Sequence, residues 1–172
     1  MNMIDLWQRL HHIFNLRPKD DMQPEIYIDN LSTAVQRQLI DSLLRNIKEI
    51  NTSFAIPEPY TEVMVKSPEA VVQFLAQGAL VGGLFGQLRF DGYAMPHLGF
   101  IFDEPGYMTI AYQGDDSWNG LALIALFEFF RGIKVQDKNA IIHLNPEYFD
   151  VKAQVTFKTT LQEYLDEKIS PS

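Results

Sequence analysis

The fold is decided by one apolar stretch, Trp118 to Arg131, which reads WNGLALIALFEFFR. Its central part, Leu121–Phe130, carries a single charge, that of Glu128. A membrane-spanning helix needs roughly 20 apolar residues, so this stretch is too short to cross a bilayer. A helix this apolar is stable in water only when nearly every side of it is covered. We therefore predict a buried helix over 118–131 at the centre of the core, with Asp115-Asp116-Ser117 as its N-cap and Gly132 just past its end.

Two amphipathic helices are predicted before this stretch. Apolar residues recur at helical spacing over 2–16 and again over 32–50. In the second helix, polar residues such as Gln36 are expected on the solvent side. The segment between the helices, 17–30, is polar and contains two prolines, which indicates a linker with one short strand at Ile26-Tyr27-Ile28.

The rest of the chain is rich in strand and turn signals. Short aromatic runs are separated by Asp91-Gly92 and Glu104-Pro105-Gly106, and such short turns suit hairpins rather than parallel crossovers. The predicted elements are strands over 61–66, 84–90, 98–102, 107–113, 140–144 and 151–159, a helix over 67–77, loop or extended chain over 51–60, and a last helical turn or two within 161–169. The fold class that follows is α+β: a mainly antiparallel sheet of about five to six strands, the buried helix and the two N-terminal helices. We expect a single globular domain over 1–172, with an N-terminal helical part at 1–50, a sheet-containing part at 61–160 and a short C-terminal tail.

The composition limits the functions to be expected. The chain has 172 residues, no cysteine and a formal net charge of −8. Without cysteine there are no disulfides, thiolate nucleophiles or cysteine-based metal sites. A net negative charge disfavours broad electrostatic binding to nucleic acid or anionic membranes and favours a basic partner. The N-terminal segment lacks the basic and apolar regions of a targeting signal, so we expect a cytoplasmic protein.

Known catalytic patterns do not match this sequence. The glycine-rich stretch 78–86 lacks the lysine and Ser/Thr of a phosphate-binding loop, and the histidines lack metal-site spacing, so neither a cofactor nor a metal is expected. The carboxylate best suited to acid–base chemistry is Glu128, because apolar surroundings raise the pKa of such a group. It would act with His97 or His143. The alternative, which we favour, is that Glu128 and Arg131 form the narrow wet stripe of an otherwise buried helix.

The charge pattern singles out residues 90–130 as a candidate binding surface. This segment contains six acidic residues, no lysine or arginine, and almost half of the aromatic residues. Most of the acids lie in or beside predicted turns, so we expect them to form one acidic rim with tyrosine and tryptophan nearby. Acids are also ordinary residues of turns and helix caps, which is the alternative. The candidate partner-binding residues are Asp91, Asp103, Glu104, Tyr107, Asp115, Asp116 and Trp118, with Tyr107 and Trp118 as anchors.

These features favour a non-enzymatic binding protein that masks a basic protein partner through an acidic, aromatic face. A small, acidic, single-domain chain of this kind is typical of an immunity protein or antitoxin that neutralises a nuclease-like toxin acting in the cytoplasm. The alternatives are a small hydrolase- or isomerase-type enzyme that uses Glu128 with His97 or His143, and an acidic secretion chaperone or adaptor. A binding protein should copurify with a larger basic protein, whereas an enzyme should bring Glu128 and a histidine within hydrogen-bond reach.

Overall fold

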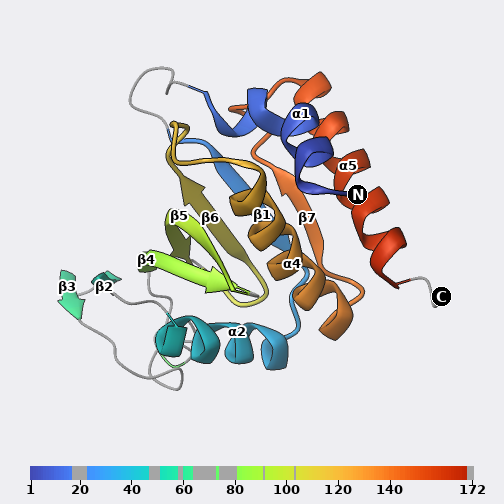
Figure 1. Ribbon diagram of the computed structural model, residues 1–172. Helices are drawn as coiled ribbons and strands as arrows, with labels where there is room; N and C mark the ends of the chain where they lie inside the picture. The colour runs from blue at the N-terminus through green and yellow to red at the C-terminus, as the bar shows by residue number, and fades with distance from the viewer. Residues whose placement is uncertain are drawn as a thin grey trace.

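The structure is a computed structural model that describes residues 1–16, 23–46, 51–57, 60–63, 73, 81–90, 92–102 and 104–169. Within these residues, helices pack on a mainly antiparallel sheet, so the predicted α+β class is confirmed. Three helices that contact one another cover one face of the sheet: α1 (Met3–Phe14), α4 (Gly120–Gln136) and α5 (Val151–Ile169) (Figure 1). The fourth described helix, α2 (Thr33–Asn46), contacts β4 at the lower edge of the view.

The described sheet contains seven strands in the order β3-β2-β4-β5-β6-β1-β7, and every neighbouring pair is antiparallel. The strands are β1 (Glu25–Asp29), β2 (Asn51–Pro57), β3 (Tyr60–Val63), β4 (Val81–Phe90), β5 (Tyr93–Ile101), β6 (Met108–Tyr112) and β7 (Ile141–Leu144). Five to six strands were predicted. The sheet is larger because β2, which was predicted as loop or extended chain, pairs with both β3 and β4.

The strand predicted over 151–159 is wrong, because α5 begins at Val151 and runs to Ile169. Apolar residues alternate at the start of this segment, which mimics the period of a strand. The buried positions, however, are Ala153, Phe157 and Leu161, which recur every fourth residue, while Val151 and Val155 are 76% and 58% exposed. A helix that buries one stripe and exposes two valines on its outer side explains the pattern.

The other predicted helices agree with the structure where it describes them. α1 and α2 lie within the predicted ranges 2–16 and 32–50, and the strand predicted at 26–28 is the middle of β1. The helix predicted over 67–77 lies outside the described residues, except for Gln73, which is helical.

The buried helix begins and ends later than predicted. Its N-cap is Asn119 rather than Asp115-Asp116-Ser117, because the Asn119 side chain accepts hydrogen bonds from the backbone N–H groups of Leu121 and Ala122. Gly132 lies inside α4, which continues to Gln136. Gly120 allows α1 to approach closely, since a Cβ there would lie 2.5 Å from the carbonyl oxygen of Met3.

α4 is the central element of the described core, as predicted. On the sheet side, Phe129 contacts Phe100 of β5 with ring centroids 5.8 Å apart. On the α5 side, Phe127 contacts Phe157 at 6.0 Å and Tyr164 at 5.4 Å. Among the described helices, none is both long and apolar enough to span a membrane.

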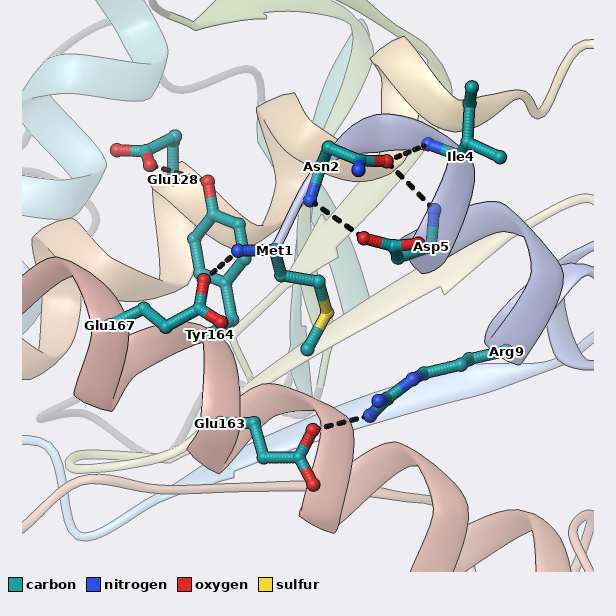
Figure 2. Close-up of polar contacts among 9 residues, drawn as sticks. All are labelled: Met1, Asn2, Ile4, Asp5, Arg9, Glu128, Glu163, Tyr164 and Glu167. Carbon is teal, nitrogen blue, oxygen red and sulfur yellow. Dashed lines mark hydrogen bonds and ion pairs between the residues drawn. The ribbon is translucent and has the colours of Figure 1, made fainter.

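Polar contacts also join α1 to α5 (Figure 2). The Asn2 side chain caps α1 by accepting hydrogen bonds from backbone N–H groups of the first turn. Arg9 of α1 pairs with Glu163 of α5, and the α-amino group of Met1 pairs with Glu167. Because Arg9 and Glu163 are both nearly half exposed, water screens their pair and its contribution to stability is small.

Truncating the buried face of α4 should destabilise the protein strongly. Leu123→Ala and Phe127→Ala remove fully buried side chains and should each lower the free energy of unfolding by about 2–5 kcal/mol. Leu121→Ala is the matched control, because Leu121 lies on the same helix and is 45% exposed. Urea denaturation measures all three. Equal stability of Leu123→Ala and Leu121→Ala would show that α4 is peripheral.

Candidate functional site

Glu128, the candidate catalytic carboxylate, is buried rather than part of a wet stripe. Glu128 is 5% exposed, and its carboxylate lies beside the Tyr164 hydroxyl (Figure 2). The Tyr164 hydroxyl donates to Oε1 at 2.5 Å, and Arg131 Nε donates to Oε2 at 2.7 Å. The predicted pair with Arg131 therefore forms, but the expectation that Glu128 faces water is wrong, because α5 places Tyr164 over it.

The environment of Glu128 explains its ionisation. Burial raises the pKa of this carboxyl, but the hydrogen bonds from Tyr164 and Arg131, together with the charge of Arg131, outweigh burial and hold the pKa below its ordinary value of 4.5. Glu128 is therefore a paired carboxylate at neutral pH. This is the opposite of the raised pKa expected for a general acid.

The proposed catalytic pairs of Glu128 with His97 or His143 do not form. His143 lies opposite Tyr27 in the β1–β7 pair, and its Nε2 lies 2.8 Å from the Asp29 carboxylate. His97 is exposed and alternates along β5 with residues that face the helices, such as Phe100. The sheet thus separates both histidines from Glu128. Among the described residues, no group of three or more His, Asp or Glu side chains is placed to hold a metal ion.

Neutralising Glu128 should cost stability in a pH-dependent way. Glu128→Gln weakens two hydrogen bonds to a buried charge and should lower the unfolding free energy by about 1–3 kcal/mol at pH 7. Because folding lowers the pKa, the native state binds fewer protons than the unfolded chain, and this contribution is complete above pH 4.5 and declines as the pH falls below it. The gap between wild type and variant should therefore shrink on acidification.

A matched control for this prediction is Glu163→Gln, which removes the same charge from the exposed pair with Arg9. Its effect at pH 7 should stay under about 1 kcal/mol. Chemical denaturation at several pH values measures both variants. A Glu128→Gln variant that behaves like Glu163→Gln would contradict the buried network.

The candidate partner-binding acids fall into two groups. Asp91 and Asp103 lie outside the described residues. Glu104 and Tyr107 precede β6, whereas Asp115 and Asp116 follow it, so β6 places the two groups roughly 20 Å apart along the strand direction. The described acids therefore do not form the single rim that the sequence suggested.

Trp118, the second candidate anchor, is a buried core residue. It is 2% exposed, and its ring lies 4.6 Å from Phe14 and 5.4 Å from Tyr112. Its indole Nε1 donates to the carbonyl oxygen of Gln113 at 2.8 Å. Trp118 thus joins the end of α1 to β6 as part of the core.

Glu104 and Tyr107 instead join residues of β1 and β7 to form what we call the acidic sheet face. Its members are Glu25, Tyr27, Asp29, Glu104, Tyr107 and His143. Alternate residues of β1 are only partly buried, and no described helix covers them, because Ile26 and Ile28 point to the helices. The β1–β6 register ends with Ile28 opposite Met108, the residue after Tyr107, and the Tyr27 and Tyr107 rings are 5.6 Å apart.

Hydrogen bonds fix the side chains of this face. The Tyr27 hydroxyl donates to Glu25 Oε2 at 3.0 Å, and Asn145 Nδ2 donates to the same oxygen at 3.0 Å. Burial and the neighbouring Glu25 carboxylate raise the pKa of Tyr27, so the phenol stays protonated. The His143 ring contacts the Tyr27 ring edge-on, with centroids 5.6 Å apart.

The loop that carries Glu104 and Tyr107 is held by a buried amide. Gln36 was predicted on the solvent side of its helix, but it is 2% exposed. Its Nε2 donates to the carbonyl oxygens of Glu104 and Tyr107 at 3.1 and 3.0 Å, and its Oε1 accepts from the N–H of Gly106 at 3.2 Å. The prediction fails because backbone groups of the loop need partners that only a side chain reaches here.

A second contact fastens the same end of the sheet. The Asp137 carboxylate, which follows α4, accepts a hydrogen bond from the N–H of Ser32 at 2.7 Å. This bond lowers the pKa of Asp137 and ties the start of α2 to the end of α4. Gly106 has a φ of 82°, and a Cβ there would lie 3.2 Å from the carbonyl oxygen of Leu31, so the turn requires glycine.

These segments surround an open hollow of about 750 Å³, which we call the loop hollow. It is lined by Asp29, Asn30, Leu31, Ser32, Glu104, Pro105, Gly106, Tyr107, Asp137 and Asn139. The sequence pattern that could have indicated the β1 side of this surface is Glu25-Ile26-Tyr27-Ile28-Asp29. In this pattern Glu25, Tyr27 and Asp29 alternate with two isoleucines, as in a strand with one buried side. An acidic and aromatic surface is therefore present, but β1 and β7 supply most of it.

No protein-family model matches the chain, and no curated protein matches it. Its fold is similar to that of a chain in the crystal structure of the toxic C-terminal tip of CdiA from Pseudomonas aeruginosa in complex with immune protein. The TM-score is 0.51 at 17% sequence identity, and the similarity covers 73% of this chain and 88% of that chain. The chain thus shares the fold of a component of a toxin–immune protein complex.

Removing the Gln36 amide should destabilise the loop 104–107 more than the rest of the fold. Gln36→Leu leaves three part-buried backbone groups without their partner and should lower the unfolding free energy by about 1–3 kcal/mol. Amide hydrogen exchange at Gly106 should also accelerate. Gln38→Leu, an exposed change on the same helix, is the control and should alter neither measurement. Equal exchange rates at Gly106 in the two variants would show that the Gln36 amide does not hold this loop.

Proposed function

We propose that this chain is a non-enzymatic immunity protein that binds a basic, toxin-like protein in the cytoplasm and masks it through the acidic sheet face. The observation that carries the proposal is the face itself, in which partly exposed Tyr27 and Asp29 lie beside Tyr107. The fold similarity to a chain from a toxin–immune protein complex supports the same class of partner.

The physical argument rests on charge and on anchoring area. A net charge of −8 attracts a basic protein over several ångströms and speeds its encounter with this chain. Tyrosine side chains then provide large contact area at low entropic cost, which is typical of interface anchors. Because the Gln36 side chain already holds the loop 104–107 through hydrogen bonds, ordering this loop on binding costs little free energy.

The experiment is a binding titration against the basic protein encoded beside this chain, repeated at two salt concentrations. Asp29→Asn combined with Glu104→Gln should slow association and flatten its salt dependence, while stability changes little. Asp115→Asn combined with Asp116→Asn removes the same charge from the other end of β6 and is the matched control. The control should bind nearly as fast as wild type.

Two results would change the proposal. If the control pair slows association as much as the Asp29 and Glu104 pair, net charge rather than the acidic sheet face governs encounter. If this chain binds its partner only when the partner is unfolded, the secretion-chaperone alternative is favoured over an immunity protein.

A further inference from the structure

We infer that the acidic sheet face seats an arginine side chain of the partner against Tyr27 and Tyr107, beside the Asp29 carboxylate. The inference rests on the proposed function and names the chemistry that the face recognises. The two tyrosine rings are 5.6 Å apart at an interplanar angle of 54°, so they do not stack face to face on each other. Cations are attracted to such ring faces by the ring quadrupole.

Two carboxylates that border the loop hollow have acceptor capacity to offer. Among the described residues, Asp29 accepts one side-chain hydrogen bond, from His143 to Oδ2, whereas a carboxylate has about four acceptor sites. The exposed Glu104 carboxylate accepts no hydrogen bond from the part of the chain that the structure describes. A guanidinium carries five N–H donors in one plane and can donate to carboxylates while its flat face lies on a ring.

This combination favours arginine over lysine. An ammonium group is compact and strongly hydrated and has no flat face to lay on a ring, so it gains less from the tyrosines than a guanidinium does. A cation–π contact at an exposed site contributes a preference of about two- to fivefold in affinity. The face should therefore distinguish two partners of equal charge.

The seat for this side chain exists before binding. Tyr27 is held through Glu25 by Asn145, and the loop of Tyr107 is held by Gln36, which is almost fully buried. A preformed seat retains more of the interaction free energy as affinity than a mobile one does.

The test uses capped tetra-arginine and tetra-lysine peptides as probes, titrated into the full chain at low salt and followed by NMR. The arginine peptide should bind about two- to fivefold more tightly and should shift the amide signals of Tyr27, Asp29 and Tyr107. Tyr107→Leu should abolish the preference for arginine, and Asp29→Asn should weaken both peptides. Asp116→Asn, an equal charge change beyond the far end of β6, should preserve the preference.

Equal affinity for the two peptides, or signal shifts confined to residues 113–117, would overturn the inference. So would a Tyr107→Leu variant that folds as wild type, by its amide spectrum, and still prefers arginine. If the arginine peptide seats on this face and the basic protein of the titration does not bind, the inference stands and the proposed function fails. If that protein binds and the peptides show no preference, the proposed function stands and the inference fails.

Discussion

The rest of the structure depends on the burial of one charge. A carboxylate surrounded by phenylalanines on α4 is unfavourable unless it is paired, and Glu128 finds its partners in Arg131 on its own helix and Tyr164 on α5. Tyr164 lies on the same buried side of α5 as Phe157, whose ring contacts Phe127 of α4, so one packing of α5 both pairs the carboxylate and buries these rings. α1 contacts both α4 and α5 and buries Leu6, Leu10 and Phe14, and with it the helical layer is complete.

The same dependence shows why the sequence predicted α4 well and α5 badly. A continuous apolar run identifies a buried helix without knowledge of its neighbours. The residues of α5 bury one side only, against α1, β7 and α4, and the first turns of α5 place valines toward water, so a local period of two hides the helical period. The contacts that bury Ala153, Phe157 and Leu161, and so decide which side of α5 is inside, come from distant elements and leave no local pattern.

The sequence indicated an acidic and aromatic surface but not which strands would form it. Acidity and aromatic content are properties of composition, and Glu104 and Tyr107, named from the sequence as candidates, are exposed and partly exposed in the structure. Tyr27 and Asp29 were missed because the strand order puts β1 between β6 and β7, far from its neighbours in the chain. Trp118 shows the converse, since a residue proposed as an anchor beside the acids lies just before the buried helix and packs against Phe14 in the core. Long-range strand pairing creates this surface, and no local pattern encodes such pairing.

The alternation within β1 has a consequence for how such a chain can diverge. Ile26 and Ile28 support the fold from one side of the strand, while Glu25, Tyr27 and Asp29 occupy the other side and contribute nothing to the helical core. Mutation can therefore rewrite the outer side of the strand while the inner side, and the architecture with it, is inherited unchanged. Descendants of one ancestor could keep a common scaffold and yet recognise different molecules, with their sequences drifting apart fastest at every second residue.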